Sequence, residues 1–118
     1  MRKALVHSLI LFMLLFTEQN AWANERLARC IAEKGWVMYG SITCSGCRAQ
    51  RKAFGNAFAH ITEIECNPHI ANNQVERCLD RKIGKTPTWI LEKDGAEIKR
   101  IESYQLLEDL AVLTGCDG

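Results

Sequence analysis

The sequence predicts an α/β fold in which a mixed central sheet is flanked by helices. Three observations lead to this class. The apolar run Trp36-Val37-Met38-Tyr39 is followed closely by Cys44-Ser45-Gly46-Cys47 and a segment with helical periodicity. Two strand-like runs meet at Asp94-Gly95, a strong signal for a hairpin turn. Segments of helical period separate and follow these strands, so helices are expected to cover the sheet.

The first 23 residues have the parts of a secretory signal peptide. Arg2 and Lys3 form a positive start, residues 4–16 are apolar, and Ala21-Trp22-Ala23 supplies small residues for a signal peptidase. The 13-residue apolar stretch is shorter than the roughly 18–20 residues of a membrane span. We expect cleavage after Ala23, which leaves residues 24–118 as one domain. A retained signal anchor is the alternative.

The mature segment is small, close to neutral and rich in cysteine. Without Arg2, Lys3 and Glu18 it keeps 13 of the 15 basic and 13 of the 14 acidic residues, so we expect no nucleic-acid partner. All six cysteines lie after the expected cleavage point. An even number of cysteines in a small exported domain indicates disulfides and an oxidising compartment, here the periplasm.

Hydrophobic spacing and turn residues predict the first four elements. Residues 25–34 form a short helix that ends at Gly35, and 36–40 form a strand too apolar for a sheet edge. Residues 45–59 form a second helix and 61–66 a second strand. The inner stripe of the second helix comprises Cys47, Ala53, Phe54, Ala57 and Phe58.

The second half of the domain contains a helix, a hairpin and a last helix. The third helix begins near Asn73 with Glu76 as a capping partner and ends at Gly84. Strands at 88–91 and 96–101 flank the Asp94-Gly95 turn, and Ser103 caps a helix that reaches Leu113. The residues expected to face inward are Val75, Cys78, Leu79 and Ile83 in the third helix, and Leu106, Leu107, Leu110 and Leu113 in the last.

The Cys44-x-x-Cys47 motif indicates thiol–disulfide exchange. A first cysteine at a helix N-terminus faces unpaired backbone N–H groups and the positive end of the helix dipole, both of which favour thiolate. The second cysteine lies in the first turn, near enough to close a disulfide with it.

Thr86-Pro87 precedes a strand, and the local sequence leaves two interpretations open. With a cis bond, Thr86 could present its backbone to an extended segment of substrate. With a trans bond, Pro87 only separates a helix from a strand.

The ordered motifs of residues 36–115 resemble the thioredoxin superfamily. They are most similar to the thioredoxin-like domain fused to bacterial homologues of vitamin K epoxide reductase. The resemblance implies a thioredoxin-like fold with the order α-β-α-β-α-β-β-α. The motifs that carry it are Met38-Tyr39-Gly40, Thr43-Cys44-x-x-Cys47 with Gln50, Phe54-Gly55, Glu65-Cys66-x-Pro68, Cys78, Thr86-Pro87-Thr88-Trp89 and residues 110–115.

The resemblance also implies roles for individual residues. Cys44 is the attacking or attacked sulfur, Cys47 resolves the mixed disulfide, and Pro87 is a cis proline that shapes the substrate groove beside Thr86. The family also pairs cysteines at the positions of Cys66 and Cys78 as a structural bridge. Of the three pairings left once Cys44–Cys47 is taken as the exchanging pair, we therefore expect Cys66–Cys78 together with Cys30–Cys116.

Three departures from the family pattern bear on the activity. Ser45-Gly46 between the cysteines matches neither reducing thioredoxins nor strong oxidants. Met38 stands six residues before Cys44, where thioredoxins carry a buried aspartate, so no internal base for Cys47 is evident. The sequence also contains no quinone-reductase membrane domain. The electron partner is therefore expected to be a separate membrane protein, either a quinone-linked oxidase or an electron donor.

We expect a periplasmic thiol–disulfide oxidoreductase, an oxidase or isomerase, that acts on exported proteins without a cofactor or metal. A disulfide reductase of the same fold is one alternative. A copper- or metal-handling protein and a binding module stapled by three disulfides are the non-enzymatic alternatives. Four basic residues either surround the motif with positive potential or are simply solvated: Arg48, Arg51, Lys82 and Lys85.

Overall fold

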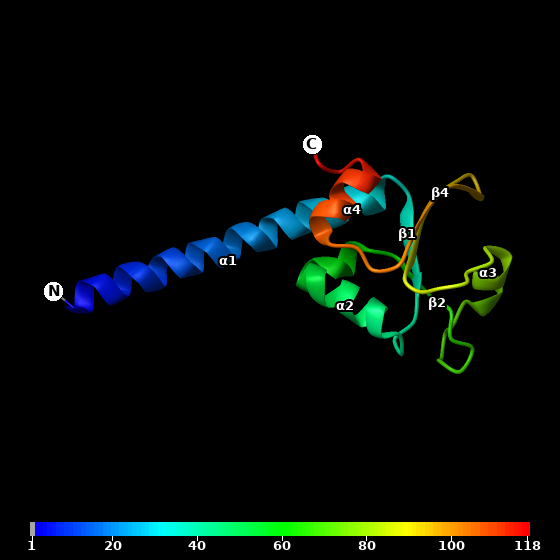
Figure 1. The fold of residues 1–118 in the computed structure, drawn as a ribbon, viewed down its shortest axis with the longest axis horizontal. Coiled ribbons are helices and arrows are strands. Elements are labelled where there is room, and N and C mark those ends of the chain that lie inside the picture. Colours follow the sequence, from blue (N-terminus) through cyan, green and yellow to red (C-terminus); the bar gives the residue numbers. More distant parts are fainter. Residues whose placement is uncertain (1) are drawn as a thin grey trace.

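A four-stranded mixed sheet organises the chain, whose computed structural model describes residues 2–118. The strand order is β2-β1-β3-β4, with β2 parallel to β1 and β3 antiparallel to both of its neighbours (Figure 1). The predicted α/β class with a mixed sheet is therefore confirmed. The elements in chain order are α1 (Arg2–Glu33), β1 (Trp36–Gly40), α2 (Ser45–Phe54), the 3₁₀ helix η1 (Gly55–His60), β2 (Glu63–Glu65), α3 (Val75–Asp80), β3 (Thr88–Lys93), β4 (Ala96–Glu102) and α4 (Leu107–Thr114).

Helices lie on both faces of the sheet. On one face, Met38 and Trp89 pack in a buried cluster with residues of α1, α2, η1 and α4. On the opposite face, Tyr39 and Ile90 pack in a second cluster with Cys78 of α3. The sheet thus separates α2, which carries the Cys44-x-x-Cys47 motif at its start, from α3.

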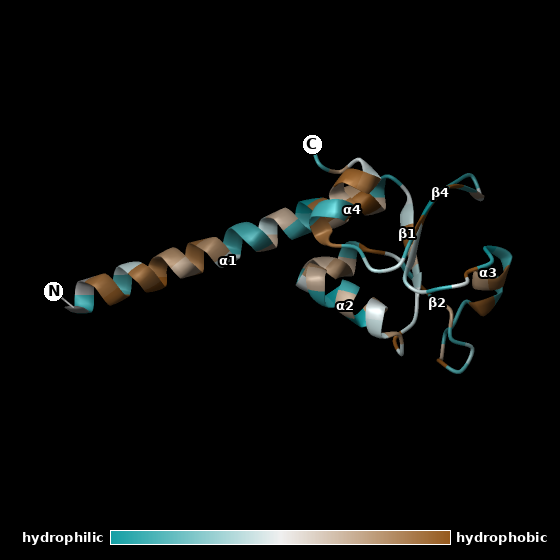
Figure 2. Cartoon of the chain, viewed as in Figure 1, coloured by the Kyte–Doolittle hydropathy of each residue, from teal (hydrophilic) through white to brown (hydrophobic). Residues whose placement is uncertain are grey.

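The first helix is much longer than the predicted 25–34. α1 begins at Arg2 because no glycine or proline interrupts residues 2–33, and its N-terminal part projects away from the sheet (Figure 1). Residues 5–23 are exposed, and Asn24 is the first partly buried position among the described side chains. Figure 2 shows the mainly apolar colouring of this projecting half. Within residues 2–118, no helix has both the length and the apolar character needed to cross a membrane.

The central strand and the hairpin agree with the sequence. β1 has its predicted bounds and lies between β2 and β3, which is why it is apolar on both faces. The hairpin turn places Asp94 at φ 53° and Gly95 at φ 79°, the positive values of a tight turn between twisted strands.

Two predicted elements of the first half are too long. α2 ends at Phe54 instead of residue 59, because Gly55 adopts φ 61° and donates its N–H to the carbonyls of Arg51 and Lys52. The chain continues as the tighter η1. The second strand covers only Glu63–Glu65 of the predicted 61–66, since its register with β1 extends over three residues.

In the second half, three of the residues expected to face inward do not, and one predicted cap is wrong. Leu79 is 64% exposed, because α3 has six residues and its inner side is occupied by Cys78. Ser103 does not cap α4: it lies at φ 76° and donates its N–H to Pro87 O, so the helix begins at Leu107. The late start leaves two predicted inward residues exposed, Leu106 and Leu113, while Leu110 is buried.

Candidate active site

Cys44 lies where the loop after β1 turns into α2. It is the N-cap residue, with an extended backbone, and its Sγ accepts the N–H of Cys47 at 3.3 Å. A serine or aspartate oxygen usually makes this capping bond, and here a sulfur makes it. The thiol is partly exposed and is not in a disulfide. Solvent therefore reaches the sulfur that the helix N-terminus holds in place.

The surroundings of Cys44 favour its thiolate. Partial burial raises the pKa of this thiol, but hydrogen bonds from the Cys47 and Thr86 side chains and from the backbone N–H groups of Cys47 and Gly46 lower it further, and the net pKa falls below the ordinary value. A thiol with a lowered pKa is more ionised at neutral pH and leaves more readily from a disulfide.

Cys47 differs from Cys44 in both exposure and pKa, although it is only three residues away. Its side chain is fully buried against β1, and its Sγ accepts the N–H of Ser41 at 3.4 Å. Burial, together with the hydrogen bond to Cys44, raises the pKa of Cys47 to about 12 despite that N–H. The motif therefore pairs one accessible, acidic thiol with one buried thiol that holds its proton.

Thr86 and Pro87 lie directly beside the motif, as predicted. Their peptide bond is cis, one of the two states that the sequence left open. Cys44 Sγ donates to the carbonyl oxygen of Thr86 at 3.4 Å. A Cβ on Gly46 would lie 3.1 Å from Pro87 Cδ, so the absence of a side chain at Gly46 allows this close approach. Pro87 itself is buried, and the Thr86 backbone is the part that faces the reactive sulfur.

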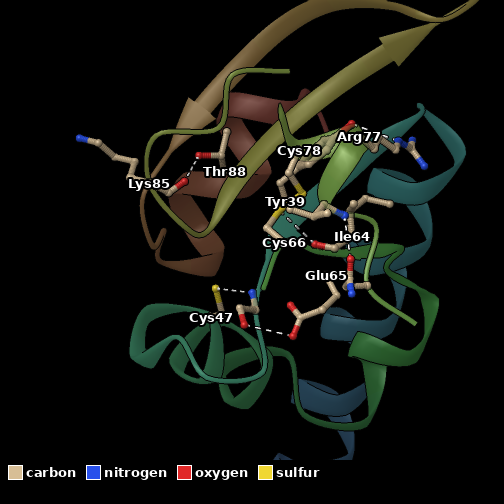
Figure 3. The surroundings of a disulfide bond; sticks show 12 residues. Tyr39, Cys47, Ile64, Glu65, Cys66, Arg77, Cys78, Lys85 and Thr88 are labelled. Carbon is tan, nitrogen blue, oxygen red and sulfur yellow. Dashed lines mark hydrogen bonds between the residues drawn. A yellow bond between two sulfur atoms is a disulfide. The ribbon is translucent and has the colours of Figure 1, made fainter. Parts of the chain in front are cut away.

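The other four cysteines form both expected bridges. Cys66–Cys78 links the segment after β2 to α3, and Cys30–Cys116 links α1 to the segment after α4. Figure 3 shows the first bridge together with Cys47. Cys66 and Cys78 belong to the cluster on the α3 face of the sheet and Cys47 to the opposite one, so this bridge is separate from the motif.

Sequence reasoning missed the polar network behind Cys47. Ser41, whose N–H meets the Cys47 sulfur, donates its hydroxyl to Glu65 Oε1 at 3.1 Å, and the same oxygen accepts the N–H of Ile42. Thr43 Oγ1 lies 2.9 Å from Ser41 Oγ and accepts the amide of Asn67. The alternation of Glu63 and Glu65 in β2 was visible in the sequence, but not that these carboxylates face α2.

The four basic residues do not form a uniform positive surface. Arg51 is paired with Glu63, and Lys85 Nζ lies 3.6 Å from Glu102. Arg48 and Lys82 are exposed. Two of these four side chains are thus balanced by carboxylates.

No protein-family model and no curated protein matches this chain. In the part of the chain that the structure describes, no three or more His, Cys, Asp or Glu side chains gather in a way that could hold a metal ion.

Proposed function

We propose that the chain is an exported thiol–disulfide oxidoreductase in which Cys44 and Cys47 exchange disulfides with protein substrates. One observation carries the proposal. The two thiols of the motif differ in both access and acidity, with Cys44 partly exposed and lowered in pKa and Cys47 buried with a pKa of about 12. Exchange through a mixed disulfide requires this division between an outer reacting sulfur and an inner resolving one.

The oxidising cycle follows from these two environments. A substrate thiolate attacks Cys44 Sγ of the Cys44–Cys47 disulfide, and Cys47 leaves as a thiolate that takes up a proton. A second substrate thiolate then attacks the substrate sulfur of the mixed disulfide and expels the Cys44 thiolate. The substrate loses two electrons and gains a disulfide, while the Cys44–Cys47 pair gains two electrons.

The same chemistry favours an oxidase or isomerase over a reductase. A lowered Cys44 pKa stabilises the thiolate, and therefore the reduced form, so the disulfide form tends to accept electrons. Reoxidation then requires a partner outside this chain. A separate membrane protein linked to quinone is the partner class that the resemblance implies.

The fold and the location belong to the same proposal. We assign the mixed sheet and its helices to the thioredoxin-like class, supported by the motif at the start of α2 and by the cis Thr86–Pro87 bond against it. Export to the periplasm is supported by the two disulfides of the domain. Cleavage after Ala23 is supported by burial, which begins at Asn24.

A redox titration tests the proposal. The purified protein is equilibrated in glutathione buffers, alkylated, and its modified cysteines are counted and located by mass spectrometry. We expect Cys44 and Cys47 to titrate as a pair above about −200 mV while the other four cysteines stay bridged. A midpoint near about −270 mV would instead indicate a reductase. If no pair titrates separately from the two bridges, the proposal is wrong and a disulfide-stapled binding module is the better interpretation.

A further inference from the structure

In the proposed exchange, the buried thiol of Cys47 must lose its proton before it can attack, so it needs a proton acceptor. The inference below rests on that proposed function. Met38, at the position where thioredoxins carry a buried aspartate, has no group that can accept this proton, as the sequence already indicated. The structure brings a carboxylate to the thiol from the neighbouring strand. A Cβ on Gly40 would lie 2.9 Å from Cys47 Sγ and 3.2 Å from Glu63 Oε1. The sulfur and the carboxylate oxygen therefore share the space that the missing side chain of Gly40 leaves open.

Glu63 reaches this position through the register of the sheet. It is paired with Met38 across the parallel β1–β2 ladder, on the side of the sheet that faces α2. Arg51 lies one helical turn after Cys47 on α2 and donates to both oxygens of Glu63, to Oε2 at 2.8 Å. The two side chains are about one-quarter and one-fifth exposed, which places the ion pair at the edge of the buried thiol.

Four ionisable groups face Cys47 from the surrounding elements. Cys44 lies at the start of α2 and Arg51 on its next turn, while Glu63 and Glu65 project from β2. Glu65 is turned towards the loop after β1, where its Oε1 accepts from Ser41 and Ile42. Glu63 Oε1 is one of the three atoms nearest to a Cβ on Gly40, together with Cys47 Sγ and Met38 Cε.

We propose that Glu63, held in place by Arg51, exchanges the proton with Cys47 Sγ during disulfide exchange. When Cys47 resolves a mixed disulfide, its thiol proton passes to the Glu63 carboxylate. The Cys47 thiolate attacks Cys44 Sγ, the Cys44–Cys47 bond forms, and the substrate sulfur leaves as a thiolate. In the opposite direction the Cys44–Cys47 bond breaks, and the departing Cys47 thiolate takes the proton back from Glu63.

A two-phase thiol assay isolates this step. The protein, with Cys44 and Cys47 reduced and both bridges intact, is mixed with a nitrobenzoate disulfide whose thiolate product is coloured. Cys44 attacks the reagent and releases one coloured thiolate in the first phase. Cys47 then attacks Cys44 Sγ and releases the second. The first phase reports on Cys44 alone, and the second reports on Cys47 and its proton acceptor.

We expect Glu63→Gln to leave the first phase unchanged and to slow the second by about 10²-fold at neutral pH, the usual contribution of a positioned base. The slowed rate should rise tenfold per pH unit, because hydroxide must then remove the proton, whereas the wild-type rate should depend less on pH. Glu63→Asp should restore part of the rate. Glu97→Gln is the matched control, because it breaks a bidentate Arg100–Glu97 ion pair on β4 instead.

The outcomes separate this inference from the proposed function. If the wild-type protein shows no second phase, the proposed exchange fails. If it shows both phases and Glu63→Gln retains the wild-type second phase and pH profile, Glu63 is not the proton acceptor and the exchange stands. Slowing by Glu65→Gln in place of Glu63→Gln would also overturn the assignment.

A second measurement applies if Glu63→Gln does not fold. Glu63→Asp keeps a carboxylate that Arg51 can bind but shortens its reach by one methylene. Its second phase should be slower than that of the wild-type protein, while its first phase should be unchanged. A second phase as fast as that of the wild-type protein would contradict the inference.

Discussion

Cys44 and Cys47 show how far two identical side chains diverge when their surroundings differ. Cys44 caps α2 and meets backbone N–H groups, whereas Cys47 turns inward against β1. Burial acts on both thiols in the same direction and raises the pKa of each, so hydrogen bonds to Cys44 decide the difference. The reactivity of the motif is thus set atom by atom at the start of one helix.

Alkylation of single-cysteine variants tests this difference. In Cys47→Ser the rate of Cys44 alkylation should follow a thiolate whose pKa lies below the ordinary value of about 8.5, and the rate should fall as pH drops through that pKa. In Cys44→Ser, Cys47 should react at least about 100-fold more slowly at pH 8, because its thiol stays protonated and buried. Iodoacetamide labelling followed by mass spectrometry measures both rates.

Comparison of Cys47→Ser with Cys47→Ala provides the control. Serine keeps a hydrogen-bond donor beside Cys44 and alanine does not, so the pKa of Cys44 should be higher in Cys47→Ala. Equal pKa values in the two variants would contradict the role of the Cys47 side chain.

At the scale of elements, Gln50 connects α2 to the rest of the domain. Its fully buried amide donates to Gln105 O at 3.0 Å, and its carbonyl accepts the N–H of Gln105 at 3.0 Å and the indole N–H of Trp89 at 3.5 Å. One side chain thereby holds the motif-bearing helix against the loop before α4 and against β3.

Gln50→Ala should destabilise the protein by about 2–4 kcal/mol, because it leaves several buried polar groups without partners, each costing about 1–3 kcal/mol. Urea unfolding monitored by circular dichroism measures the loss. Gln74→Ala is the control, since Gln74 is exposed and makes no side-chain cap to α3; its effect should stay within about 0.5 kcal/mol. Equal losses in the two variants would show that Gln50 has no such role.

At the scale of the whole molecule, two disulfides join segments that the sheet alone does not hold together. Cys30–Cys116 fastens the buried end of α1 to the end of the chain across 86 residues, and Cys66–Cys78 closes a 12-residue interval between β2 and α3. Neither bridge includes a thiol of the motif. The two bridges and the two free thiols of the motif therefore involve different cysteines.

The paired serine variants should lose more stability the longer the loop that each bridge closes. Chain entropy predicts a loss of about 4.6 kcal/mol for Cys30→Ser with Cys116→Ser and about 2.8 kcal/mol for Cys66→Ser with Cys78→Ser. Cys44→Ser with Cys47→Ser opens only a tiny loop and should lose the least. Urea midpoints of the three oxidised variants give the order, and a larger loss for the motif pair would favour a structural role for Cys44 and Cys47.

What could be predicted from the sequence was local or confined to one face of an element. β1 is recognisable because it is apolar on both faces, the Asp94-Gly95 turn because it requires positive φ values, and Cys44 as a helix start because of its spacing from Cys47. The disulfide pairing came from the order of motifs, and both bridges are present. Apart from the disulfide pairing, each of these signals lies within a short stretch of residues.

Only the tertiary structure decided the features that depend on contacts between distant segments. Leu79 is exposed because α3 presents Cys78 to the sheet, and the cis bond at Pro87 lies against Gly46, more than 40 residues earlier. The register of β1 and β2 pairs Glu63 with Met38, and the Glu63 side chain brings its Oε1 to 3.2 Å from where a Cβ on Gly40 would lie. The sequence alone indicated which sulfur lies at the start of α2, because a helix N-terminus is a local feature. The position of Glu63, the proton acceptor that we propose for the other sulfur, was set by strand register, which only the folded sheet defines.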